Sequence, residues 1–208
     1  MEFEVNLDVK RIQGLTDAVF AVAMTILIIE IRIPEGLNAD VLSRYFFEKI
    51  LPELFVYMLG FVTLGIFWIG SHFHHHLITK TDRVSSWLNI LFLMSICMIP
   101  FSVGFLNHYR HEKLSVIVFS LNLILTSALI YLMLYYSWKK AYIKPHYTLE
   151  HFKYARRRII RPIYCYLAII LISFLSTPIA FYSLLIPIIL HLIPENDKMD
   201  IEDHIFNY

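Results

Sequence analysis

"RIQGLTDAVFAVAMTILIIEI", residues 11–31, is the stretch that decides the fold of this chain. It begins with a cation, places an acid at Asp17, and then continues with almost wholly apolar residues from Ala18 to Ile29. A helix needs about 20 apolar residues to cross a bilayer. The run is too short to cross alone, so we expect a membrane helix over residues 15–33 with ionisable groups near its start.

The composition places the rest of the chain in the membrane as well. Of 208 residues, 58% are hydrophobic and only 17% are charged, and the mean hydropathy is +0.60. Soluble domains carry about 25% charged residues. The net charge of +1 gives no argument for a nucleic-acid partner. The two cysteines, Cys97 and Cys165, lie in apolar runs and are interpreted as small buried hydrophobic side chains.

Six apolar segments are candidate membrane helices, which predicts an all-α membrane protein with one six-span domain over residues 1–208. Thirteen of the 18 Lys and Arg residues fall in the connections on the side of the N-terminus. The positive-inside rule therefore predicts a multi-pass protein of the cell membrane with both termini in the cytosol. The expected spans are about residues 15–33, 51–70, 87–106, 114–138, 159–175 and 178–193.

The longest connection, residues 139–161, is also the most basic. It is either a helix that lies along the inner membrane surface, where cations meet anionic lipid, or a solvated linker.

The first span carries an aliphatic stripe. At about 100° per residue, Val22, Ile26, Ile29 and Ile33 share one face, and Thr25 lies at its edge. Periodicity alone does not distinguish a pore lining from a packing face. Small residues at positions 14, 18, 21 and 25 also allow another helix to come close.

Two ionisable residues mark the start of this span. A charged side chain in a membrane helix is costly unless it is paired or faces water or protein, so it suggests function. Arg11 and Asp17 are six positions apart and are not direct neighbours on one helix. We expect their partners on another helix or another subunit, and the alternative is an exposed pair of little energetic value.

Three motifs stand in the order in which a known family carries them. The opening stretch resembles the Arg-x-x-x-Phe-Ser-Asp signature in the first helix of the lysosomal potassium channel family, transmembrane protein 175, and its prokaryotic homologues. "GIFWIGSHFHHHLI", residues 65–78, is similar to the family's Phe-Trp-x-x-x-His motif, and "WLNILFLMSICMIPFS", residues 87–102, is similar to its third helix. The resemblance covers roughly residues 10–140, and beyond them only the topology agrees.

This resemblance implies a homotetrameric, potassium-preferring cation channel whose first helices surround the pore. It implies no enzyme activity, no cofactor and no resident metal. The partners it implies are potassium and other monovalent cations, membrane lipid and further copies of the chain. It places a hydrophobic constriction at Val22, Ile26 and Ile29, with Thr25 as a hydroxyl layer. The polar network that holds the first helix in place matches Arg11, Thr16, Asp17, Trp68, His72 and Asn89.

The chain departs from the family pattern in two places. Leu15 and Thr16 replace the usual Phe and Ser, so an aromatic ring is lost while a hydroxyl is kept. Val22 is smaller than the isoleucine or leucine common at the narrowest ring, which predicts a wider gap.

The histidines suggest a rival class, a membrane metalloenzyme, because clustered imidazoles can bind transition metals. The predicted topology separates the inner and outer sets by about 30 Å of hydrocarbon, which excludes one shared centre. We expect Trp68, His72 and His76 to pack toward the first helix, and His74 and His75 to form a wet helix end. The inner set also includes His146 and His151, and the outer set is His108 and His111.

The second rival class is a secondary transporter. Transporters of this kind place broken helices and charged residues near the membrane midplane. Pro100 and Pro187 are the candidate break points, but no Asp, Glu or Lys lies in the middle of an expected span. The sequence therefore favours a channel over a carrier.

Overall fold

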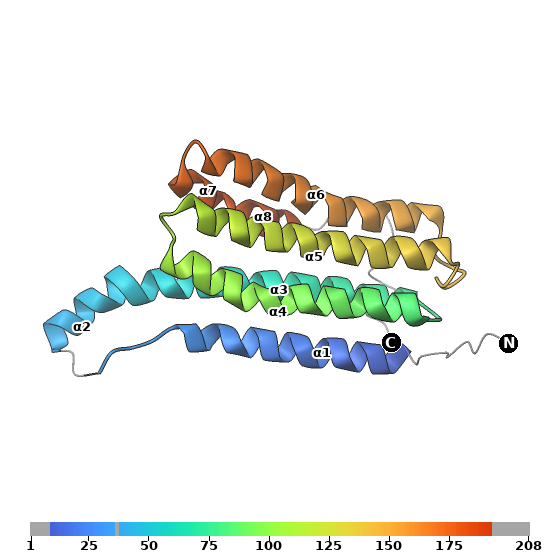
Figure 1. Ribbon diagram of the computed structural model, residues 1–208, viewed down its shortest axis with the longest axis horizontal. Helices are drawn as coiled ribbons and strands as arrows, with labels where there is room; N and C mark the ends of the chain where they lie inside the picture. The colour runs from blue at the N-terminus through green and yellow to red at the C-terminus, as the bar shows by residue number, and fades with distance from the viewer. Residues whose placement is uncertain (1–8, 36–37, 193–208) are drawn as a thin grey trace.

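Long helices arranged side by side make up the chain (Figure 1). The computed structural model describes residues 9–35 and 38–192, and within these ranges it contains helices and one isolated β-bridge. In chain order the elements are α1 (Val9–Ile26), η1 (Leu27–Glu30), α2 (Ala39–Tyr45), η2 (Phe46–Ile50), α3 (Leu51–Leu77), α4 (Arg83–His108), α5 (Lys113–Lys139), α6 (Leu149–Ser173), α7 (Thr177–Ser183) and α8 (Leu185–Leu192). Of these, η1 is a 3₁₀-helix and η2 is a π-helical turn.

The expected all-α fold is confirmed. Among the described residues, four helical stretches are long and apolar enough to cross a membrane: Val9–Glu30, Val41–Leu77, Arg83–His108 and Lys113–Lys139. Helix α6 is not among them because its first half is strongly basic, and α7 with α8 forms only a shorter apolar stretch, Thr177–Leu192. That α6 and α7–α8 cross as fifth and sixth spans stays a prediction. Ile193 lies outside the described residues.

The first membrane helix begins and ends earlier than expected. It starts at Val9 instead of residue 15. In a membrane the backbone N–H and C=O groups must bond to one another, and a helix achieves this. Polar side chains do not interrupt these backbone bonds, so the helix extends through them. It ends at Glu30, and Ile31 already has extended backbone angles (φ −85°, ψ 109°). Ile33 therefore does not belong to the helical stripe.

The second membrane helix is much longer than the expected residues 51–70. Val41–Leu77 is 37 residues long, about 55 Å at 1.5 Å per residue, against a hydrocarbon core of about 30 Å. Helix α2 accordingly projects beyond the other helices (Figure 1). The π-turn η2 precedes Pro52, which has no N–H to donate to the preceding turn.

The basic connection contains the beginning of a helix. Residues 149–161 form the first half of α6 and run directly into its apolar half, so they are neither a separate surface helix nor a linker. Residues 140–148 form the loop, which pairs with the α3–α4 connection through a bridge between Ile78 and Ile143.

Helix α1 lies along one outer face of the bundle, against α3 and α4 (Figure 1). Helix α5 follows, and α6 with α7 and α8 covers the opposite face. Helix α1 begins at the same end of the bundle at which α3 and α5 end and α4 and α6 begin. We call this the basic end, after Lys80, Arg83, Lys139, Lys140 and Lys144 in its connections.

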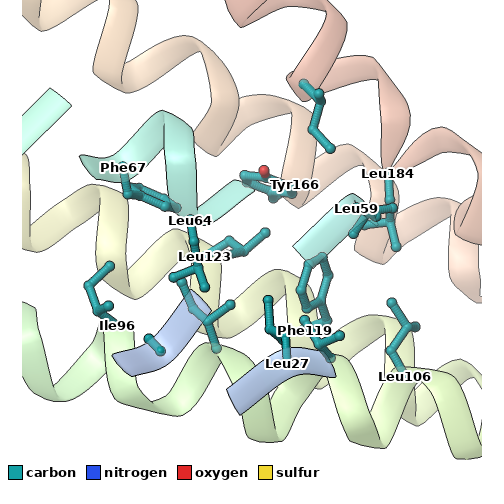
Figure 2. Packing of buried hydrophobic residues seen from close by; sticks show 14 of the residues in the cluster. Leu27, Leu59, Leu64, Phe67, Ile96, Leu106, Phe119, Leu123, Tyr166 and Leu184 are labelled. Atoms are coloured by element: carbon teal, nitrogen blue, oxygen red, sulfur yellow. The ribbon is translucent and has the colours of Figure 1, made fainter. Parts of the chain in front are cut away.

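The core joins side chains from all of the long helices. Figure 2 shows Leu27 of η1, Leu64 of α3 and Leu123 of α5 close together, with Tyr166 of α6 on the far side. Because lipid tails are as apolar as leucine, close packing holds such helices together, and small residues allow it. Gly60 is one of them, since a Cβ there would lie 2.7 Å from a methyl carbon of Val103 on α4.

Candidate pore-lining helix and its polar contacts

Helix α1 has one face that packs on the bundle and one that does not. Phe20, Ala23 and Leu27 are 1–3% exposed and lie against α3 and α4. Val22 is 56% exposed and Ile29 is 69% exposed within the single chain. Ile26 is also exposed. The predicted constriction residues therefore lie on the open face of α1 and of η1, which continues it.

The last turn of this helix aligns two of these side chains. Residues 27–30 form a 3₁₀-helix, in which side chains three positions apart eclipse one another. Ile29 consequently lies almost directly above Ile26, closer to alignment than a continuous α-helix would bring it.

Thr25 lies beside the aliphatic stripe, and its hydroxyl proton is donated to a backbone carbonyl of the same helix. Its hydroxyl lies 2.9 Å from the carbonyl oxygen of Val22 and 3.0 Å from that of Ala21, and it donates within its own helix. The oxygen lone pairs of Thr25 are left to accept on the exposed side. Such an oxygen suits contact with a cation.

Asp17 is joined to the second long helix. Trp68 of α3 donates from its indole Nε1 to Asp17 Oδ1 over 2.9 Å, and the ring of His72 lies beside the indole at a centroid distance of 5.8 Å. Arg11 is exposed and forms no hydrogen bond or ion pair with any residue that the structure describes. Within one chain, only Asp17 of the two ionisable residues is therefore tied to another helix.

A second polar contact joins α1 to α4. The buried Thr16 hydroxyl donates to the carbonyl of Ile12 over 2.9 Å and accepts from Asn89 Nδ2 over 3.3 Å. Both side chains are almost completely buried. The two polar contacts lie close together along α1, so they determine both the position and the rotation of its first half.

The histidines are arranged differently from expectation. His74 and His75 are buried, at 5% and 4% exposure, whereas His72 and His76 are exposed. The expected wet helix end at His74 and His75 is wrong, because their side of α3 packs toward α4 and α5 at the basic end. Of the expected stripe, Trp68 alone bonds to α1. His108 lies at the opposite end of the bundle, in the last turn of α4.

Asp82 joins the start of α4 to α5 and to the loop after α5, and it belongs to none of the sequence motifs above. It is the N-cap of α4, and its carboxylate accepts from the backbone N–H of Ser85 over 2.8 Å and from the hydroxyl of Tyr136 over 2.6 Å. Tyr142 donates to the same carboxylate over 3.3 Å. An aspartate a few residues before an apolar run is a helix-start signal, which could have identified it. Partial burial raises the pKa of Asp82, but these hydrogen bonds outweigh it, and the pKa lies below its usual value.

We expect the contribution of Asp82 to stability to depend on pH. Because its folded-state pKa is lowered, the contribution is present above the unfolded pKa of about 3.9 and is lost as pH falls through the folded-state pKa. Asp82→Asn should lower the free energy of unfolding at pH 7 by roughly 1 kcal/mol, the difference between charged and neutral hydrogen bonds. The difference in Tm between wild type and Asp82→Asn should become smaller below about pH 4.

Glu112→Gln is the matched control, because Glu112 precedes α5 in the same way but forms no side-chain cap. A gap between wild type and Asp82→Asn that stays constant down to pH 2 would contradict the prediction.

No group of three or more His, Cys, Asp or Glu side chains that could hold a metal occurs within residues 9–35 and 38–192. The inner histidines and His108 are at opposite ends of the bundle, so they do not meet in one centre.

Comparison with known proteins shows which families and relatives the chain resembles. Residues 11–100 match the family model of the endosomal/lysosomal potassium channel TMEM175. A potassium channel of Streptomyces collinus is 29% identical over 102 residues, which are 49% of each chain. A potassium channel of a Chryseobacterium species is 28% identical over 127 residues, 60% of this chain and 62% of the relative. The chain thus matches about half the length of the Streptomyces relative.

The fold agrees over a longer stretch. The crystal structure of a lysosomal potassium-selective channel TMEM175 homologue from Chamaesiphon minutus superposes with a TM-score of 0.78, at 19% identity, over 88% of this chain and 95% of the other. Such a likeness shows the shared fold. In sequence, residues 11–100 are thus similar to the TMEM175 family, and most of the chain shares the fold of a TMEM175 homologue.

Proposed function

We propose that this chain forms a potassium-preferring cation channel, a homotetramer in which four copies of α1 surround the pore. The observation that carries the proposal is the open face of α1. Val22, Ile26 and Ile29 are exposed in the single chain, while the opposite face of the same helix is almost completely buried.

The small residues of α1 favour a protein neighbour over lipid on the open side. Gly14, Ala18 and Ala21 are exposed and form a strip that flanks the aliphatic stripe. Contact with lipid does not require small side chains, whereas close approach of another helix does. In a tetramer the strip would contact the neighbouring α1, which leaves the aliphatic stripe facing the shared axis.

The proposed pore is controlled by aliphatic rings. Such a ring expels water when it is narrow and passes ions when it is wide enough to stay wet. Removing water from an ion is expensive, so a small change in radius decides conduction. Val22, Ile26 and Ile29 supply successive rings, and Thr25 supplies hydroxyl oxygens between them.

The proposed topology is one channel domain with six spans in the cell membrane. The basic connections after α3 and α5 lie at the end of the bundle at which α1 begins (Figure 1). The positive-inside rule assigns this end to the cytosol, together with both termini. In this arrangement Asp17, Trp68, Thr16 and Asn89 position the cytosolic half of α1, and Arg11 is available to a neighbouring subunit.

Purified protein in planar bilayers tests the proposal. With potassium on one side and sodium on the other, we expect unitary current steps and a reversal potential that favours potassium. Native mass spectrometry should show four chains. Saturable flux without unitary steps would indicate a carrier instead, and near-stoichiometric iron or zinc in the purified protein would support a metalloenzyme.

A further inference from the structure

A small cavity with several polar side chains in its lining lies at the basic end of the bundle, behind α1. It is enclosed by the last turn of α3, the α3–α4 turn, the first turns of α4, and α5, and Ile12 of α1 closes one side. Its volume holds about one water molecule. None of the exposed residues of α1 lines it, so it is separate from the proposed pore.

Unsatisfied polar atoms concentrate in this cavity. Six buried side-chain atoms have no hydrogen-bond partner within the described part of the chain, and four of them belong to residues that line the cavity. These four are His74 Nδ1, His75 Nε2, Thr81 Oγ1 and Ser85 Oγ. His74, His75 and Thr81 are each no more than 5% exposed. Buried polar groups without partners are costly and rare in native proteins, so this concentration points to a ligand.

The donor and acceptor pattern identifies what the ligand must offer. His75 Nδ1 lies 2.7 Å from the carbonyl oxygen of Ser71. A carbonyl only accepts, so Nδ1 carries the proton and Nε2 presents a lone pair to the cavity. The hydroxyls of Thr81 and Ser85 can each donate or accept. A ligand that donates to this imidazole nitrogen and accepts from a hydroxyl would satisfy both groups.

Water meets these requirements in a space of this size. A buried water needs two to four polar partners, and the residues that line the cavity carry four unsatisfied polar atoms. A bound metal cation fits less well, because no carboxylate lines the cavity to balance its charge. We propose that this cavity binds one water molecule, which donates to His75 Nε2 and accepts from the hydroxyl of Thr81.

Such a water would join the end of α3 to the α3–α4 connection, close to the point where α1 is held. Asn89, which donates to Thr16 of α1, also lines the cavity. Holding the water accounts for the buried position of His75, which the proposed channel does not use.

The sign of a stability change tests the proposal. If the Thr81 hydroxyl holds the water, Thr81→Val removes a hydrogen bond and should lower Tm by about 2–4 °C for a chain of this size. If this hydroxyl holds nothing, the substitution removes an unpaired polar group and should leave Tm unchanged or raise it.

Ser120→Ala is the matched control. Its hydroxyl is buried and unpaired like the others, but it does not line this cavity, so its Tm should not fall. A high-resolution map of the full-length protein should show a density peak within about 3.2 Å of His75 Nε2. A map without this peak, or an unchanged or raised Tm for Thr81→Val, overturns the proposal. Both measurements are independent of ion flux, so they stand apart from the proposed channel activity.

Discussion

Val22→Asn should raise the unitary cation current by on the order of tenfold and reduce the preference for potassium over sodium. Val22 is exposed on the open face of α1, where the proposed constriction requires ions to lose water. Four amide groups would replace part of the lost hydration, and a barrier lowered by about 1.4 kcal/mol corresponds to a tenfold rate. Single-channel recording with potassium and sodium on opposite sides measures both quantities.

Val84→Asn is the control for this result. Val84 lies at the start of α4 and is 49% exposed, close to the 56% of Val22, but it is not on α1. It should leave conductance and selectivity unchanged. If Val22→Asn behaves like Val84→Asn, Val22 does not line the ion path.

The second large effect is expected from Trp68→Phe, which should destabilise the protein by about 1.5 kcal/mol. The substitution keeps an aromatic ring but removes the only indole donor to Asp17, which is 2.9 Å away. Hydrogen bonds to charged groups contribute about 1.5–3 kcal/mol in soluble proteins, and the largest values measured between membrane helices are about 1.7 kcal/mol. Reversible unfolding in mixed detergent micelles measures the free energy.

Two variants separate this bond from general effects of the substitution. Asp17→Asn retains an oxygen that can accept from Trp68, so its effect should be smaller than that of Trp68→Phe. Trp87→Phe alters an exposed tryptophan on α4 and should have little effect. Equal losses for Trp68→Phe and Trp87→Phe would show that the Asp17 bond contributes nothing to stability.

The sequence was sufficient for the all-α fold and for the apolar parts of the long helices, because hydropathy over about 20 residues is a strong signal. It failed at the helix ends. Arg11, Gln13 and Thr16 are polar, yet they lie within α1, since each side chain extends from a backbone that remains hydrogen-bonded. The additional α2 and η2 before α3 were missed for a similar reason, because Arg44, Glu48 and Lys49 resemble a loop in composition.

The polar contacts were only partly predictable. The pairing of Asp17 with Trp68 depends on how α1 and α3 lie relative to each other, which no local pattern specifies. Four histidines within five positions look equivalent in the sequence, but α4 and α5 cover His74 and His75 and leave His72 and His76 outside. Burial here is decided by neighbouring helices that come later in the chain.

The 3₁₀ segment η1 gives the end of α1 a means of changing shape with little movement elsewhere. A 3₁₀-helix turns about 120° and rises about 2.0 Å per residue, whereas an α-helix turns about 100° and rises about 1.5 Å. If residues 27–30 rewound to α geometry, Ile29 would swing by about 60° relative to Ile26 and the segment would shorten by about 2 Å. In a four-fold assembly, that local rewinding would move four methyl-bearing side chains sideways at once, while the helices behind them stayed where they are.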